Sequence, residues 1–180
     1  MIGGGPKEKR EVNDFYPTPI EVTHAFMQWL KIGSGAFIRE PCCGDGMMSK
    51  VIESYGHNVY SSDIVSSGYG TSGVDFLISP PVYCDAIITN PPFNLAEKVI
   101  RRALFQAPLV AVVLKATYWH AKTRQELFKE YPPAYILPLT WRPDFMGGGA
   151  PTMDFMWTLW RRGDTVTKYQ PLDKPDLYLL

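Results

Sequence analysis

The tetrapeptide Asn90-Pro91-Pro92-Phe93 follows a predicted buried strand and has the residue types best suited to chemistry in this sequence. Neither proline can donate a backbone hydrogen bond, and Pro92 keeps Pro91 extended, so the loop is stiff. The Asn90 side-chain oxygen and the Pro91 carbonyl can accept both N–H bonds of an exocyclic base amine, while Phe93 offers a face for stacking. The tetrapeptide therefore predicts alkylation of an aromatic amine; the alternative is a structural turn that ends in a buried Phe.

A second candidate site is the segment from Glu40 to Gly46, which lies between a predicted strand and a predicted helix. Gly44 and Gly46 would let the backbone approach a ligand, and Asp63, about 20 residues later, could hold two ribose hydroxyls. The carboxylates of Glu40 and Asp45 would repel a pyrophosphate but suit the cationic methionine end of S-adenosylmethionine. The segment predicts a methyl-donor site, although a tight turn with Asp45 as a helix cap is the alternative.

Asp75 and Phe76 complete the predicted cofactor site. Asp75 could accept the amino group of the donor's adenine, and Phe76 could pack against the ring or belong to the core. The three histidines and three cysteines show no metal-ligand spacing, so no metal is predicted, and the cysteines are interpreted as reduced thiols.

The alternation of apolar and turn-rich segments predicts an α/β fold, because strands alternate with helices throughout the chain. The pattern favours a mostly parallel, doubly wound sheet with helices on both faces, followed by an antiparallel hairpin at the C-terminal end. The predicted strands are 36–39, 58–62, 85–89, 109–114, 134–139 and 153–160, and the predicted helices are 18–30, 47–55 and 95–106. The domain prediction is a flexible segment at 1–13, one catalytic domain at 14–165 and a tail at 166–180.

Composition limits the partners and the location of the protein. With 46% hydrophobic residues among 180, the chain can bury a core, and no apolar run reaches the roughly 20 residues that span a bilayer. We therefore expect a cytoplasmic protein without a membrane partner. Eighteen basic and 18 acidic residues give a net charge of zero, which counts against a broad nucleic-acid surface but leaves room for a local basic patch.

These motifs resemble the amino-group DNA methyltransferases, which act on the exocyclic nitrogen of adenine or cytosine. Over roughly residues 14–160, the family's acid-Pro-x-x-Gly-x-Gly turn is matched by Glu40 to Gly46 and its catalytic motif by Asn90 to Phe93. The resemblance implies a Rossmann-like class I methyltransferase fold that uses S-adenosylmethionine. It also implies that Tyr16-Pro17-Thr18-Pro19 is an additional donor-binding segment. The predicted cofactor-binding residues are Tyr16, Thr18, Pro19, Glu40, Pro41, Cys42, Gly44, Gly46, Asp63, Asp75, Phe76 and Asn90.

The resemblance also implies a set of substrate contacts downstream. Arg142, Phe155 and Trp157 are similar to the late loop and strand that flank the flipped base in phage-type members, together with Phe93. Alternating core residues on a strand are the alternative for Phe155 and Trp157. The long target-recognition region of the family is missing. The protein would therefore read few bases, act on single strands or depend on a partner.

The sequence thus predicts methyl transfer to a nucleic-acid base, with adenine N6 in DNA first, in a bacterial or phage-infected cell and by a monomer or weak homodimer. RNA or a protein glutamine is the alternative substrate, because the same tetrapeptide also fits a side-chain amide. A non-catalytic nucleotide-binding module or an NAD-linked oxidoreductase is the alternative from another class, which Glu40, Asp45 and the tetrapeptide disfavour.

Overall fold

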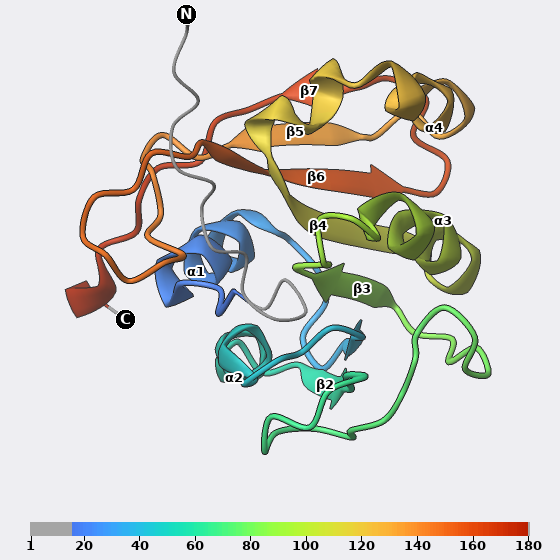
Figure 1. The fold of residues 1–180 in the computed structure, drawn as a ribbon, viewed down its shortest axis with the longest axis horizontal. Coiled ribbons are helices and arrows are strands. Elements are labelled where there is room, and N and C mark those ends of the chain that lie inside the picture. The colour runs from blue at the N-terminus through green and yellow to red at the C-terminus, as the bar shows by residue number, and fades with distance from the viewer. Residues whose placement is uncertain (1–15, 180) are drawn as a thin grey trace, which may run out of the picture.

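A seven-stranded sheet forms the centre of the protein, whose computed structural model describes residues 16–179 (Figure 1). The predicted flexible segment at 1–13 lies outside the described residues. The sheet order is β2-β1-β3-β4-β6-β5-β7, in which β6 runs antiparallel to both of its neighbours and the other pairs are parallel. The strands are β1 (Phe37–Glu40), β2 (Asn58–Ser61), β3 (Ala86–Thr89), β4 (Leu109–Lys115), β5 (Tyr135–Pro138), β6 (Phe155–Arg161) and β7 (Lys168–Tyr169).

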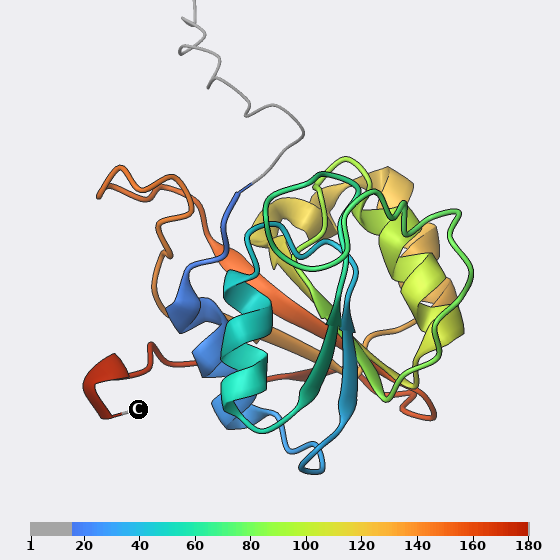
Figure 2. The same ribbon diagram turned by 90° about the horizontal axis from the view of Figure 1, so that it is seen from below.

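Helices cover both faces of the sheet (Figure 2). On one face lie α1 (Ile20–Trp29) and α2 (Met47–Ser54), and on the other lie α3 (Ala96–Gln106) and α4 (Gln125–Glu130). Short 3₁₀ turns occupy Ala116–His120, Lys122–Arg124 and Leu177–Leu179. The predicted α/β fold with its Rossmann-like sheet and C-terminal antiparallel pair is therefore confirmed, and each predicted strand and helix agrees to within two residues.

Two hydrophobic cores result from the two-residue period of the strands. Along β4, Ala111 and Val113 pack toward α1 and α2, whereas Val110 and Val112 pack toward α3 and α4. A strand covered on both faces has to be apolar at successive positions, which explains the unbroken apolar run at 109–114. This central strand lies between β3 and β6 and separates the parallel half of the sheet from the antiparallel half.

The C-terminal segment contributes an element that the sequence did not predict. Residues Lys168–Tyr169 form β7 at the edge of the sheet, parallel to β5, within the segment that we interpreted as a tail. Leu172 is 5% exposed and packs into the core on the side of α1, next to its bridge partner Leu139. The two-residue strand is too short to show a two-residue hydrophobic period, and α4 with its six residues was missed for a similar reason.

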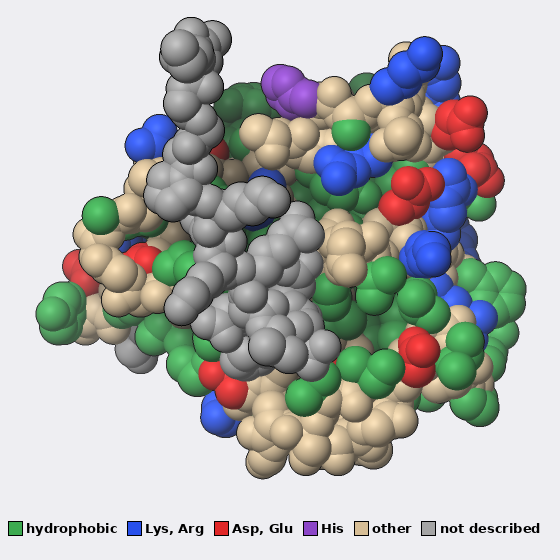
Figure 3. Space-filling view, viewed as in Figure 1, with side chains coloured by type: hydrophobic (Ala, Val, Ile, Leu, Met, Phe, Trp, Pro, Cys, Tyr) green, Lys and Arg blue, Asp and Glu red, His purple; other side chains and the backbone are tan. Residues whose placement is uncertain are grey.

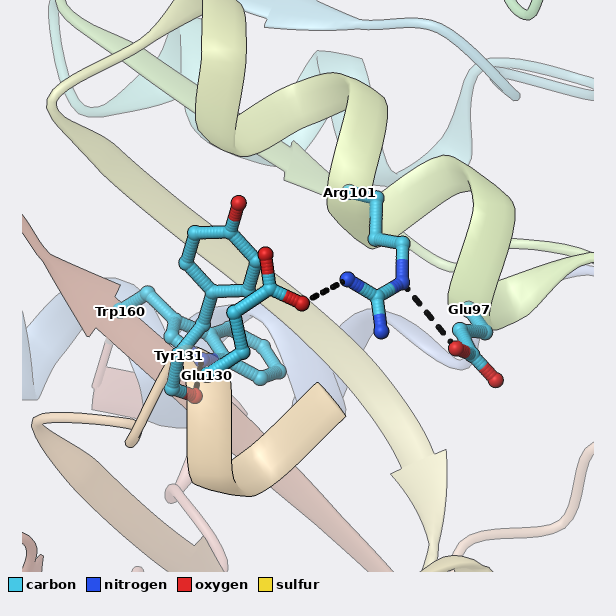
Figure 4. Close-up of polar contacts among 5 residues, drawn as sticks. All are labelled: Glu97, Arg101, Glu130, Tyr131 and Trp160. Carbon is cyan, nitrogen blue, oxygen red and sulfur yellow. Dashed lines mark hydrogen bonds and ion pairs between the residues drawn. The ribbon is translucent and has the colours of Figure 1, made fainter. Parts of the chain in front are cut away.

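Polar contacts join α3 to the end of α4 (Figure 4). The Arg101 guanidinium lies between two carboxylates, with Nε at 3.1 Å from Glu97 Oε1 and Nη1 at 2.6 Å from Glu130 Oε2. Directly after Glu130, the Tyr131 carbonyl accepts a hydrogen bond from Trp160 Nε1 at 2.9 Å. In Figure 3, cationic and anionic side chains are interspersed over the surface around α3 and α4. The visible face carries no continuous basic surface there.

Trp157 belongs to the core, which corrects its prediction as a substrate contact. Its side chain is 0% exposed, stacks on Phe26 at 4.3 Å between ring centroids, and donates from Nε1 to the Val22 carbonyl at 3.0 Å. A residue of β6 that faces α1 cannot reach a ligand at the end of the strands without unfolding the helix from the sheet. The two-residue alternation along 153–160 therefore reflects packing.

We expect Trp157→Ala to lower the free energy of unfolding by about 3–5 kcal/mol, because it removes a large buried ring and leaves a cavity. Urea denaturation followed by circular dichroism would measure the loss. Tyr178→Ala provides the control, since Tyr178 is fully exposed and its removal should change stability by less than about 0.5 kcal/mol. Similar losses in the two variants would contradict the core assignment of Trp157.

Candidate active site

A cavity of about 390 Å³ opens at the edge of the sheet where the carboxyl ends of β1, β2 and β3 meet. Ligands of open parallel sheets bind at this edge. The volume falls in the range of roughly 300–1,000 Å³ that is typical of small-molecule sites. The predicted site residues that line the cavity are Tyr16, Thr18, Glu40, Pro41, Cys42, Gly44, Asp63, Asp75, Phe76, Asn90, Pro91, Pro92 and Phe93. Of the predicted cofactor residues, Pro19 and Gly46 are not in the lining.

The glycine-rich turn owes its shape to backbone conformations that favour glycine. Gly44 and Gly46 have φ values of 50° and 80°, in the left-handed region. A Cβ on Gly46 would come within 2.2 Å of the Tyr69 ring, which covers the turn from the loop after β2. The Gly46 position thus serves the packing of the turn, and the ligand-facing surface is formed by the residues before it.

Asp63 ties this turn to the end of β2. Its Oδ2 accepts a hydrogen bond from Gly44 N at 2.9 Å, and its Oδ1 accepts one from Val65 N at 3.0 Å. Each carboxylate oxygen keeps a further lone pair, so the side chain can still accept hydrogen bonds from ligand hydroxyls. The two backbone contacts fix the carboxylate at the cavity wall, where the sequence predicts a ribose contact.

Glu40 is far less open to solvent than a carboxylate that contacts a ligand from the surface. It is 2% exposed and hydrogen-bonds to Ser49 of α2, which in turn lies 2.6 Å from the Ser61 hydroxyl. Burial raises the pKa of Glu40 well above its usual range, and the nearby Asp45 and Asp63 add to the shift. A cation bound in the cavity would favour the ionised form and lower this pKa. Ser49 was not predicted, because nothing in the sequence marks one serine of a helix as the partner of a buried acid.

Asn90 is held so that its amide nitrogen and oxygen have different environments. The Nδ2 group donates to Thr18 Oγ1 at 3.1 Å and to the Tyr16 carbonyl at 3.5 Å. The Oδ1 atom is buried and has no hydrogen-bond partner within the described residues. A buried unpaired acceptor costs about 1–3 kcal/mol, so it marks a place where a donor is expected. Tyr16 and Thr18 therefore contact the tetrapeptide Asn90 to Phe93, in addition to lining the cavity.

Phe93 lies among the side chains of Tyr16, Lys115 and Phe155, of which only Phe155 was predicted to share its surroundings. Its ring stacks near Tyr16 at 6.1 Å between centroids, and the Lys115 Nζ lies 4.5 Å from its centre. Phe155 lies 6.3 Å from it and is itself 2% exposed, packed against Phe145 at 4.2 Å. Phe155 therefore supports Phe93 from the core and does not line the cavity, which corrects its prediction as a direct substrate contact. Lys115 had a detectable signal, since it is the first charged residue after an apolar strand that ends beside the tetrapeptide.

Arg142 lies outside the cavity, in the loop between β5 and β6. Its Nε forms an ion pair with Asp154 Oδ1 at 2.8 Å, and both side chains are more than half exposed. The pair closes the base of the loop. The substrate contact by Arg142 stays a prediction. It would require a substrate that extends beyond the cavity.

Asp75 and Phe76 also line the cavity. Asp75 Oδ1 accepts from Leu77 N at 2.9 Å, which shapes the turn that presents the two residues. Phe76 is 4% exposed and lies over the buried Arg39, whose guanidinium carbon is 4.8 Å from the ring centre. Arg39 donates to Gln106 Oε1 at 2.7 Å, and burial lowers its pKa. Phe76 is thus both a core residue and a lining residue, so the two interpretations of its sequence position are compatible.

Within residues 16–179, no three or more His, Cys, Asp and Glu side chains come together as a metal site. Cys42 and Cys43 lie in the glycine-rich turn, and burial is the largest cause that raises the pKa of each thiol to about 12. Neither thiol is therefore activated as a nucleophile. Among the described helices, none has the length and apolar character needed to cross a membrane.

Comparison with known proteins shows the fold. No protein-family model and no curated protein matches the sequence. A candidate RNA methyltransferase from Pyrococcus horikoshii superposes with a TM-score of 0.66 at 13% identity, over 88% of this chain and 90% of that one. A type I restriction-modification methyltransferase subunit from Streptococcus thermophilus gives 0.67 at 12% identity, over 87% of this chain and 47% of that one. A candidate class I S-adenosylmethionine-dependent methyltransferase from Listeria monocytogenes gives 0.64 at 12% identity, over 96% of this chain and 68% of that one.

These similarities define the class of fold. The seven-stranded sheet with its antiparallel pair is the Rossmann-like fold of the class I methyltransferases. The chain spans about half the length of the type I subunit that it resembles. At these identities the likeness establishes the architecture, and the chemistry has to be argued from the cavity itself.

Thr18→Val should release the Asn90 side chain, because valine has a similar volume but cannot accept the hydrogen bond from Nδ2. We expect exchange of the Asn90 side-chain amide protons with water to become about three- to tenfold faster, as for the loss of one buried neutral hydrogen bond. Nuclear magnetic resonance of protein labelled with nitrogen-15 would measure the rate. Thr18→Ser keeps the hydroxyl and should restore slow exchange; equal rates in wild type and Thr18→Val would contradict the contact.

Glu40→Gln should change how stability depends on pH. Because the pKa of Glu40 is raised above its ordinary value of 4.5, the folded protein binds this proton more tightly than the unfolded chain. The stabilisation is complete below the ordinary pKa and is lost as the pH rises through the raised value. In urea titrations, the free energy of unfolding of the variant relative to wild type should therefore increase as the pH rises above about 4.5. Glu126→Gln, at an exposed position of α4, should show no such trend, and a parallel trend would contradict the assignment to Glu40.

Proposed function

We propose that the protein transfers a methyl group from S-adenosylmethionine to the exocyclic amino group of a nucleic-acid base, with adenine N6 in DNA as the first candidate. The observation that carries the proposal is the Asn90 side chain, whose nitrogen is engaged by Thr18 while its buried oxygen has no partner within the described residues. Asn90 lines the same cavity as the carboxylates expected to hold the donor.

The donor fits the residues that are present. Asp63 offers fixed acceptors for ribose hydroxyls, Phe76 offers an apolar wall for adenine, and Glu40 adds a buried acid that a nearby cation would ionise. When bound, S-adenosylmethionine supplies a methyl group on a positively charged sulfur, which is already a strong electrophile. The protein therefore needs no acid–base dyad and has to position the two reactants.

The tetrapeptide does this positioning. Asn90 Oδ1 and the Pro91 carbonyl accept the two N–H bonds of the amine, so that the nitrogen lone pair turns from the ring toward the methyl carbon. A bound donor would supply the methyl carbon for this attack and would leave as S-adenosylhomocysteine, while the amine would lose its proton to solvent. Phe93 stabilises the base by stacking, with Phe155 behind it.

The geometry disfavours a dinucleotide. A pyrophosphate would bind at the N-terminus of α2, where backbone N–H groups are free in dinucleotide-binding folds. In this protein Asp45 Oδ1 accepts the Met47 N–H at 3.2 Å at that position, and the buried Glu40 lies nearby. A carboxylate at this place repels a phosphate. Asp45 therefore disfavours a pyrophosphate at this position whether it serves as a helix cap or as part of a methyl-donor site.

RNA is the second candidate substrate, favoured by the similarity to the RNA-methyltransferase candidate of P. horikoshii, which this chain covers over 90% of its length. We extend the proposal to a cytoplasmic monomer or weak homodimer. Target recognition by a partner or through few base contacts is part of the same proposal.

The test is transfer of tritiated methyl groups to DNA, RNA and protein pools, followed by mass spectrometry of nucleosides from the labelled pool. Asn90→Ala should lower the transfer rate at least about 100-fold, because it removes an acceptor used in the transition state. Donor affinity, measured by calorimetry, should stay within about threefold of wild type. Asp63→Asn is the matched control, in which donor affinity should fall first. Near-normal transfer by Asn90→Ala, or labelling of protein alone, would refute the proposal.

A further inference from the structure

The edge of the sheet that carries the cavity has an uneven distribution of charge. The acidic lining residues Glu40, Asp45, Asp63 and Asp75 all precede β3 in the chain, whereas the lining residues from Asn90 to Val99 are uncharged. Strand β4 runs parallel to its neighbour β3 (Figure 1). Lys115, the last residue of β4, therefore lies at the same edge of the sheet as the tetrapeptide. The donor half of the site is therefore acidic, and a cation lies at the substrate half.

The Lys115 ammonium has no anionic partner within the described residues. Its Nζ lies 4.5 Å from the centre of the Phe93 ring, and the ion pairs of the described chain involve Arg101 and Arg142. Arg124, in the turns that follow β4, donates to the Tyr118 carbonyl at 3.0 Å and lies over the Tyr118 ring. Among these cations, Lys115 is the one that contacts the catalytic tetrapeptide.

We propose that Lys115 binds the backbone phosphate of the nucleotide whose base stacks on Phe93, which makes a nucleic acid, and not a protein glutamine, the substrate of the site. The inference rests on the proposed function. A base on Phe93 brings along a phosphate joined to it through one sugar, whereas a glutamine side chain brings no anion. A lysine on its flexible stem is a common phosphate ligand.

The contact seen in the structure is compatible with this exchange of partners. A cation over an aromatic ring at a partly exposed site is held weakly, and a charge-assisted hydrogen bond to phosphate is stronger. The ammonium can therefore leave the ring for the phosphate when the base occupies its face. Binding of the phosphate by Lys115 and stacking of the base on Phe93 would then occur together, because the Lys115 side chain has to move off the ring before the base can stack on it.

The experiment measures binding of a fluorescein-labelled, adenine-containing single-stranded DNA oligonucleotide by fluorescence anisotropy, in the presence of S-adenosylhomocysteine and over a series of salt concentrations. Lys115→Met should weaken binding roughly three- to tenfold, and the slope of log affinity against log salt should become shallower by about 0.7, as for one lost phosphate contact. Lys115→Arg should restore both values. Lys129→Met, at an exposed position of α4, is the matched control and should leave the slope unchanged.

The outcomes separate this proposal from the proposed function. Methyl transfer to the oligonucleotide with an unchanged salt slope in Lys115→Met would overturn the role of Lys115 and leave the enzyme assignment intact. A shallower slope in a protein that transfers no methyl group would support the phosphate contact and overturn the assignment. Displacement of the oligonucleotide by adenosine monophosphate at similar concentration would replace a polymeric substrate by a free nucleotide and overturn the proposal. Loss of S-adenosylhomocysteine affinity in calorimetry of Lys115→Met would also overturn it.

Discussion

Hydrogen bonds from Asn90 Nδ2 to the Tyr16 carbonyl, which can only accept, and to the Thr18 hydroxyl orient the Asn90 amide at the end of β3. An asparagine side chain can present either a donor or an acceptor, and only the acceptor can engage both the amine and its developing charge. Thr18 lies just before α1, and Asn90 directly follows β3, so two segments far apart in the sequence have to meet for the amide to be oriented. The packing of α1 on the sheet, through Phe26 and Trp157, is the reason that they meet.

Electrostatics divides the site in a way that follows from the sheet topology. Strand β1 ends at Glu40 and β2 ends shortly before Asp63, while Asn90 directly follows β3 and Lys115 is the last residue of β4. Parallel neighbours place these ends side by side, so the acidic and the basic halves are adjacent, and a cationic and an anionic ligand could bind together. Glu40 is buried at the end of β1, next to β3, and its ionisation depends on the charges near it.

Much of this arrangement could be predicted from the sequence, because the features concerned are local. The two-residue and 3.6-residue periods located the strands and the long helices, and the place of Asn90 and Asp63 in the cavity follows from their positions just after parallel strands. Features that depend on tertiary contacts could not be predicted. Nothing in the sequence around Phe155 or Trp157 distinguishes a base contact from a core position; the antiparallel register with β4 decides it by turning both residues toward the α1 face. The partner of Glu40 and the contact between Lys115 and Phe93 likewise depend on which helix face and which strand end come together.

The short strand β7 has a consequence for solubility. Without it, β5 would end the sheet with a row of unpaired backbone groups, which is a template for pairing with other chains. Strand β7 pairs with β5 through Lys168 and the exposed Tyr169, and Leu172 packs into the core just after it. The outermost strand of the sheet is therefore only two residues long and carries a lysine. A truncation that removes the chain from residue 166 onward would expose the backbone of β5, and the shortened protein would self-associate through this edge. The residues that line the cavity would still be in place.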